Sequence, residues 1–119
     1  MSRKILIVDD DSRLLEALHA TLTFADFEVV TGRDGEEGLA LCRSEHPDVV
    51  VSDYMMPALD GLALWAEIQA DPETTGTPFI LMSSTPPAVD NTQMHSVLKK
   101  PFEADTLMSA VTEAIQDVV

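Results

Sequence analysis

The chain has 119 residues, 45% of them hydrophobic, and its 21 acidic against seven basic side chains give a formal net charge of -14. We expect one folded domain over residues 1–119, because this composition is too apolar for a disordered chain. The negative charge argues against nucleic acids and anionic membranes as partners and favours cations and basic protein surfaces. No apolar run approaches the length of a membrane span, so we expect no membrane insertion and a cytoplasmic location.

Strand and helix patterns alternate in the first half of the chain. Ile5–Asp9 lacks polar alternation and predicts a strand buried on both faces. The next segment predicts a helix whose apolar stripe is formed by leucines: Leu14, Leu15, Leu18 and Leu22. Phe27–Thr31 predicts a second, weaker strand. Arg33–Ser44 predicts a helix that Gly38 should weaken, because glycine is a poor helix former.

The alternation continues in the second half. Val49–Asp53 is the clearest buried strand, and Phe79–Ser83 and Val97–Lys99 predict two more. Between the first two of these, a helix beginning near Gly61 has four apolar anchors: Leu62, Leu64, Trp65 and Ile68. The last helix is strongly amphipathic, and its apolar face holds Leu107, Ala110, Val111, Ala114, Ile115 and Val118.

Five strands alternating with about four helices predict an α/β fold, a doubly wound parallel sheet with helices on both faces. In such sheets, ligands bind at the carboxyl ends of the strands, near the point where the strand order reverses. Four of the predicted strands end in polar residues: Asp9 and Asp10, Asp53, Ser83 and Ser84, and Lys99 and Lys100. We therefore expect three carboxylates, a hydroxyl and an ammonium to share one pocket at this edge.

Crowded carboxylates favour a hard divalent cation with oxygen ligands, and Mg²⁺ is the expected one. A carboxylate beside bound Mg²⁺ can act as a nucleophile toward a phosphoryl group and form an acyl phosphate. Such a transfer needs mainly positioning and charge neutralisation, which the cation, a lysine and a hydroxyl can supply. The residues at the strand ends therefore point to phosphoryl transfer.

Four segments together resemble the receiver domains of two-component response regulators: "ILIVDDDS", "DVVVSDYMMPALDGL", "TPFILMSS" and "KKPF". The resemblance runs from about Lys4 to Ile115. It implies a flavodoxin-like, five-stranded sheet in the order 2-1-3-4-5. It also implies a signalling module that catalyses only its own aspartyl phosphorylation and dephosphorylation, and is not otherwise an enzyme. Its phosphoryl donor would be a sensor histidine kinase or a histidine phosphotransfer protein, and its downstream partner an unknown protein.

The resemblance also implies roles for individual residues. Asp53 matches the phosphoacceptor, Ser83 the switch hydroxyl and Lys100 the phosphate-contacting lysine, with a cis bond from Lys100 to Pro101. The implied ligands of Mg²⁺, or of Mn²⁺ in its place, are Asp10, Asp53, the backbone carbonyl of Met55 and, through water, Asp9. The third acid of the first motif, Asp11, is better explained as a cap of the following helix or a residue at the pocket rim.

The chain departs from the family pattern after the fourth predicted strand. Only sixteen residues separate Ser83 from Lys100, so the fourth helix of the family pattern is expected to be short or missing. Pro86 and Pro87 oppose a regular helix there. Val97 stands where the family often has an aromatic residue that rotates on activation. We expect the phosphorylation chemistry to be kept and the output surface to be altered.

Three alternatives stay open at this point. A phosphohydrolase resembling the haloacid dehalogenases would use Asp9 as the nucleophile, but Asp9, Asp11 and Arg13 place an arginine where that pattern has Thr or Val. A flavodoxin-like cofactor binder would need a phosphate-binding loop where the acids stand. The third alternative is a receiver-like interaction module that is not regulated by phosphorylation.

Overall fold

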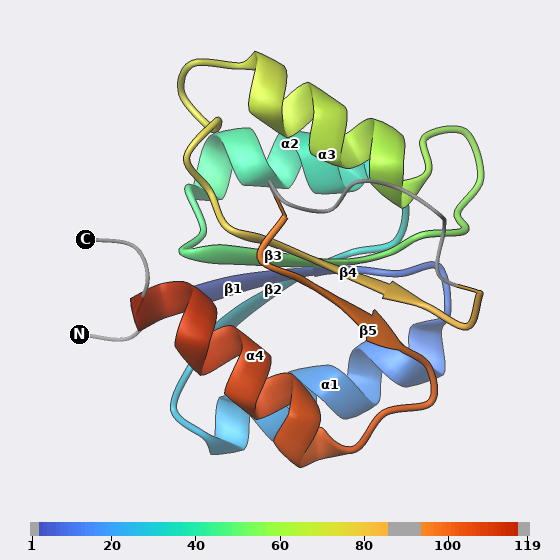
Figure 1. The fold of residues 1–119 in the computed structure, drawn as a ribbon, viewed down its shortest axis with the longest axis vertical. Helices are drawn as coiled ribbons and strands as arrows, with labels where there is room; N and C mark the ends of the chain where they lie inside the picture. The colour runs from blue at the N-terminus through green and yellow to red at the C-terminus, as the bar shows by residue number, and fades with distance from the viewer. Residues whose placement is uncertain (1–2, 86–93, 117–119) are drawn as a thin grey trace.

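The computed structural model describes residues 3–85 and 94–116, which form a five-stranded parallel sheet between two layers of helices (Figure 1). The strands are β1 (Lys4–Val8), β2 (Glu28–Gly32), β3 (Val49–Asp53), β4 (Phe79–Ser83) and β5 (Ser96–Lys99). They lie in the order β2-β1-β3-β4-β5, so the strand order reverses between β1 and β3. The predicted fold class and strand order are confirmed.

Among the described residues, two helices cover each face of the sheet. Helices α1 (Ser12–Phe24) and α4 (Ala104–Gln116) pack on one face, and α2 (Gly35–Glu45) and α3 (Gly61–Ala70) on the other (Figure 1). None of the helices that the structure describes is long and apolar enough to span a bilayer. The expected short or missing helix after β4 falls on 86–93, and Val118 follows α4, so both predictions lie outside the described residues.

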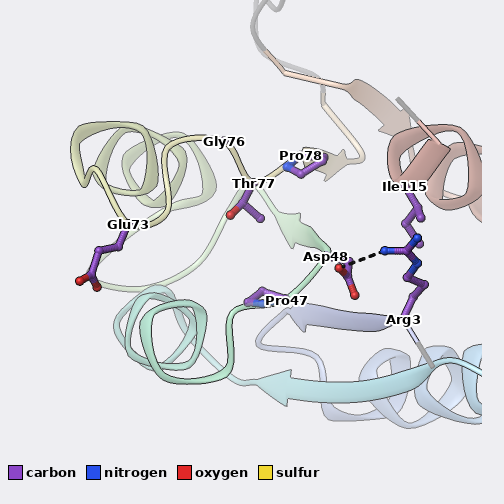
Figure 2. Close-up of a pocket in the computed structure, with 8 residues that line it drawn as sticks. All are labelled: Arg3, Pro47, Asp48, Glu73, Gly76, Thr77, Pro78 and Ile115. Atoms are coloured by element: carbon purple, nitrogen blue, oxygen red, sulfur yellow. Dashed lines mark ion pairs between the residues drawn. The ribbon is translucent and has the colours of Figure 1, made fainter. Parts of the chain in front are cut away.

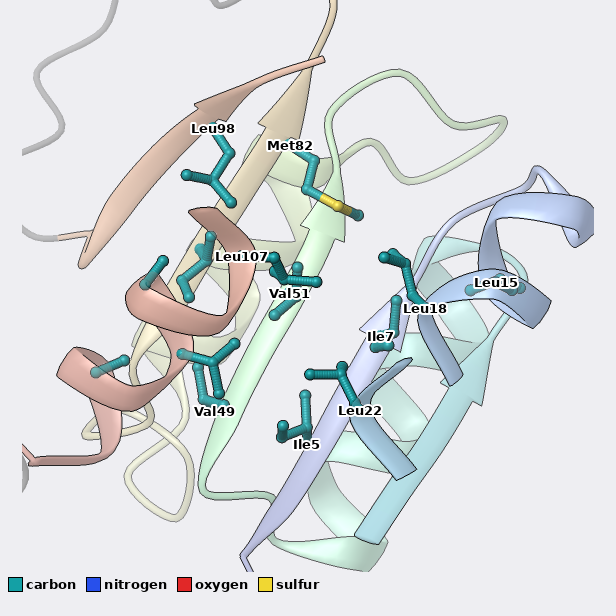
Figure 3. Close-up of a cluster of buried hydrophobic side chains, with 14 residues drawn as sticks. Ile5, Ile7, Leu15, Leu18, Leu22, Val49, Val51, Met82, Leu98 and Leu107 are labelled. Carbon is teal, nitrogen blue, oxygen red and sulfur yellow. The ribbon is translucent and has the colours of Figure 1, made fainter. Parts of the chain in front are cut away.

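The face that carries α1 and α4 holds the larger hydrophobic cluster (Figure 3). Side chains from alternate positions of the central strands meet the leucine stripe of α1 and the apolar face of α4 there. The fully buried members include Ile5, Ile7, Val49, Val51, Leu22 and Leu107. The opposite parity of the same strands, including Leu6, Val50 and Leu81, packs under α2 and α3. The central strands are therefore buried on both faces, as their continuous apolar runs predict.

Some predicted boundaries were wrong by one or two residues. The first strand begins at Lys4 and ends at Val8, although the Asp9 N–H still donates to the Gly32 carbonyl at 3.1 Å. The second strand is shifted by one residue, to Glu28–Gly32. The second helix begins at Gly35, because the Asp34 side chain accepts a hydrogen bond from the Glu37 N–H and caps it.

Gly38 has a packing role that its helix propensity did not indicate. A Cβ at this position would lie 2.8 Å from Cγ2 of Val8. Its absence lets α2 approach the sheet closely next to β1, whose end carries the acidic residues. The same glycine that weakens the helix locally therefore allows α2 to pack closely on the sheet.

Cys42 gives a prediction about thiol reactivity. Its side chain is wholly buried in α2, and burial raises the pKa of the thiol to about 11. Since the thiolate is the reactive form, we expect the native thiol at about pH 8 to react with a thiol reagent at least ~100-fold more slowly than a free cysteine. Labelling followed by mass spectrometry, with and without denaturing urea, checks this. Fast labelling of the native chain would contradict the buried placement.

Candidate functional site

Three carboxylates meet at the carboxyl edge of the sheet. Asp9 follows β1, Asp10 is the next residue, and Asp53 ends β3, the strand beside β1. One carboxylate oxygen from each of the three lies within 4.8 Å of the other two. Asp9 is completely buried and Asp53 is only 8% exposed, whereas Asp10 is exposed. The structure thus brings together the three acids that the sequence placed at successive strand ends.

Lys100 links two of these carboxylates. Its ammonium nitrogen lies 2.9 Å from Oδ2 of Asp9 and 3.1 Å from Oδ1 of Asp53. The backbone holds the lysine in place, because its N–H donates to the Ser83 carbonyl at 2.8 Å, directly beyond β5. The bond from Lys100 to Pro101 is cis, as the resemblance implied. In the part of the chain described, Lys100 is the cation of the acidic cluster.

Asp11 supports the cluster from outside it. Its backbone N–H donates to the second oxygen of Asp9 at 2.9 Å. Its exposed side chain accepts from the N–H groups of Arg13 and Leu14 and caps α1. Both oxygens of Asp9 therefore have donors, and Asp11 is a cap rather than a member of the cluster. Because Asp9 is buried and each of its oxygens accepts a hydrogen bond, it is a poor nucleophile. This weighs against the phosphohydrolase alternative.

Burial and carboxylate repulsion both act on Asp53. Burial and the neighbouring Asp9 raise the pKa of Asp53, while Lys100 and the backbone of Tyr54 act in the opposite direction without offsetting them. Burial lowers the pKa of Lys100, but its two carboxylate partners outweigh burial and the pKa lies above its usual value. The cluster thus has more negative charge than one ammonium neutralises.

The donor set fits a hard divalent cation. Oxygens bound to one Mg²⁺ lie at most about 4.2 Å apart, since Mg–O distances are about 2.1 Å. The three carboxylates, all within 4.8 Å, are close to this spacing. Asp10 leaves the cluster open to water, and Mg²⁺ usually keeps several waters. The arrangement can therefore bind a metal and present Asp53 to a phosphoryl group.

Ser83 approaches this edge from the other face of the sheet. It is buried and lies one residue beyond Met82, the register partner of Asp53. Its hydroxyl oxygen accepts a hydrogen bond from the Thr85 N–H at 3.0 Å, so the hydroxyl proton stays available for another acceptor. Val97, at the expected aromatic position, is half-buried and packs in the cluster under α2 and α3.

Sequence reasoning missed an apolar groove of about 520 Å³ beside Lys100. Its walls come from α1 and from the segment between β5 and α4, and include Leu14, Ala17, Leu18, Thr21, Lys100 and Phe102. Ala17 is exposed and Leu14 only half-buried. The sequence did contain a signal for this groove: the apolar stripe of α1 is wider than the part that the hydrophobic core covers.

A second pocket, of about 210 Å³, opens at the opposite edge of the sheet (Figure 2). Asp48 precedes β3 and Pro78 precedes β4, so this pocket lies at the amino ends of the strands. Arg3 pairs with Asp48 across it, at 3.7 Å between Nη1 and Oδ1. None of the three clustered carboxylates lines this pocket.

The sequence model of the response regulator receiver domain matches residues 5–112. The chain belongs to this family. The transcriptional regulatory protein GlrR of Escherichia coli strain K12 is 40% identical over 117 residues, covering 94% of this chain and 26% of that protein. The response regulator PleD of Caulobacter vibrioides is 37% identical over 84 residues, 71% of this chain and 18% of that protein. The receiver thus spans about a quarter or less of these relatives.

Solved receiver structures agree with this assignment. A response regulator receiver domain protein from Clostridium thermocellum superposes with a TM-score of 0.86 at 29% identity, covering 97% of this chain and 95% of that one. The chemotaxis response regulator CheY4 of Vibrio cholerae gives 0.87 at 26% identity, covering 96% and 99%. Receiver domains are signalling modules of two-component systems rather than metabolic enzymes.

Proposed function

We propose that this receiver accepts a phosphoryl group on Asp53 from a phosphohistidine of a sensor histidine kinase or histidine phosphotransfer protein. The reaction would need Mg²⁺, or Mn²⁺ in its place. The observation that carries the proposal is the grouping of Asp53 with Asp9, Asp10 and Lys100 at the edge of the sheet. No residue that this chemistry needs is missing.

The transfer is a displacement at phosphorus. A carboxylate oxygen of Asp53 forms a bond to phosphorus, the bond from phosphorus to the donor imidazole breaks, and its electron pair returns to the ring nitrogen, which is then protonated. Lys100 can turn from its carboxylate partners toward the phosphoryl oxygens, and the Ser83 hydroxyl can donate to one of them. These contacts would neutralise and orient the transferred group.

The residues that would hold the metal combine the acidic cluster with what the resemblance to receiver domains implies. Asp10, Asp53 and the backbone carbonyl of Met55 would bind it directly, and the fully buried Asp9, already bonded to Lys100 and Asp11, would bind through water. Bound Mg²⁺ would neutralise charge on the phosphoryl oxygens.

The consequence of phosphorylation is a change in partner binding. Curated relatives are named as transcriptional regulators, and a downstream partner of this receiver could be an effector domain or a separate protein. With a net charge of -14, the receiver itself is not expected to contact nucleic acid. We propose that this phosphorylation and the resulting change in partner binding take place in the cytoplasm.

The proposal is tested by intact mass after incubation with acetyl phosphate. The expected result is a gain of one phosphoryl group in Mg²⁺ and none when a chelator removes the metal. A histidine phosphotransfer protein serves as the donor if acetyl phosphate is too slow. No gain with either donor would overturn the proposal and favour the interaction module that is not phosphorylated.

The apolar groove beside Lys100 suits the docking of the phosphodonor protein. It adjoins the acidic cluster through Lys100, and its walls are apolar side chains on α1 and Phe102. A helix of the donor with an apolar face could lie against α1 and present its phosphohistidine at the sheet edge. Small-molecule donors need no such surface.

Ala17→Glu should separate the two kinds of donor. The added carboxylate would place a charge in the groove, so transfer from a histidine kinase that labels the wild type should fall at least about tenfold, while labelling by acetyl phosphate stays unchanged. Ala20→Glu on the same helix is the matched control, since Ala20 is also exposed and does not line the groove. Equal rates for both variants would contradict docking in the groove.

A further inference from the structure

Lys99 lies beside Ser83 at the carboxyl edge. In the parallel pairing of β4 and β5, Ser83 is the register partner of Lys99, and each is the last residue of its strand. Two positions back, Leu81 and Val97 are likewise partners and both pack under α2 and α3. Because side chains alternate along a strand, Ser83 and Lys99 project from that same face. The next residue, Lys100, projects toward the opposite face and contacts Asp9 and Asp53 there.

Lys99 is also an available cation. It is exposed, and it forms no ion pair with any residue in 3–85 or 94–116. The chain has three lysines, and the other two are paired: Lys4 with Glu28 and Glu45, and Lys100 with Asp9 and Asp53. The ammonium of Lys99 thus has no ion-pair partner among the described residues, and its backbone position is paired with that of Ser83.

We propose that Lys99 is a second cationic residue of the site, which attracts dianionic phosphoryl compounds and holds them from the Ser83 side. A dianion must approach a chain of net charge -14, at an edge where Lys100 is already shared by two carboxylates. Strand β5 is two strands from β3, so the Cα atoms of Lys99 and Asp53 lie about 10 Å apart. At that distance, the attraction between the Lys99 ammonium and a phosphoryl group near Asp53 is significant at low ionic strength and is screened by salt.

The test uses the phosphorylation of Asp53, so this inference rests on the proposed function. With acetyl phosphate as the probe, an Asp53 oxygen bonds to phosphorus and acetate leaves with the electron pair of the broken P–O bond. We expect Lys99→Gln to lower the rate constant per donor concentration about three-fold at low salt. Lys99→Arg, which keeps the charge, should restore it. Arg3→Gln removes an equal charge from the opposite, amino edge of the sheet and should not change the rate.

Salt and donor charge distinguish attraction from a structural effect. The difference between wild type and Lys99→Gln should shrink to under about two-fold at high salt, where the Debye length is about 3 Å. It should also be smaller with phosphoramidate, which carries less negative charge than acetyl phosphate. Equal rates for wild type and Lys99→Gln at low salt would overturn the inference, as would an equal loss in Lys99→Arg. Absence of phosphorylation in the wild type would instead overturn the proposed function.

Discussion

Asp53→Asn is expected to abolish the phosphoryl mass gain and, in the absence of Mg²⁺, to make the folded chain more stable. The loss follows because the amide has no nucleophilic carboxylate oxygen. The gain follows from charge: burial and Asp9 raise the pKa of Asp53, so the folded state disfavours its ionised form. Removing that charge should raise the free energy of unfolding by about 1 kcal/mol, as is common for substitutions that relieve strain at a functional site.

The pH dependence gives the sign of the same effect. A carboxyl whose folded-state pKa is raised destabilises the fold while it is ionised, and this cost is lost as the pH falls through the raised pKa. The wild type and Asp53→Asn should therefore converge in stability as the pH is lowered. Urea unfolding without Mg²⁺ measures this, with the exposed Asp105→Asn as a control of equal charge change. A less stable Asp53→Asn at neutral pH would contradict the electrostatic account.

Lys100→Met is expected to cause the largest loss of stability among changes at the site. The substitution keeps an unbranched apolar side chain but removes the ammonium that contacts the fully buried Asp9 and the nearly buried Asp53. Leaving a buried carboxylate unpaired costs about 3–5 kcal/mol. Because 22% of the Lys100 side chain is exposed, we expect a value near the lower end, about 3 kcal/mol.

The neighbouring lysine provides the control for this prediction. Lys99→Met removes the same charge from an exposed side chain and should change the unfolding free energy by less than about 0.5 kcal/mol. Adding Mg²⁺ should narrow the gap between Lys100→Met and the wild type, because a bound cation would neutralise the same carboxylates. Equal destabilisation by both substitutions, or a gap that Mg²⁺ leaves unchanged, would be inconsistent with the pairing.

The sequence by itself determined the fold class and the sheet edge at which the acidic cluster forms. Continuous apolar runs such as Val49–Val51 report burial on both faces, and the rule that parallel strands share one carboxyl edge then gathers Asp9, Asp53 and Lys100. Signals of this kind are local in the chain, because burial period and helix capping involve residues a few positions apart. The bounds of β3 and β4 were predicted without error for the same reason.

Only the tertiary structure decided how the acids differ from one another. Asp9 and Asp10 are adjacent and chemically identical, yet one is wholly buried and the other exposed. The pairing of Lys100 with Asp9 joins residues 91 positions apart, and the place of Lys99 beside Ser83 depends on the register of β4 and β5. Strand register and the burial of individual residues arise from packing between distant elements, so the hydrophobic periodicity of a single segment does not predict them.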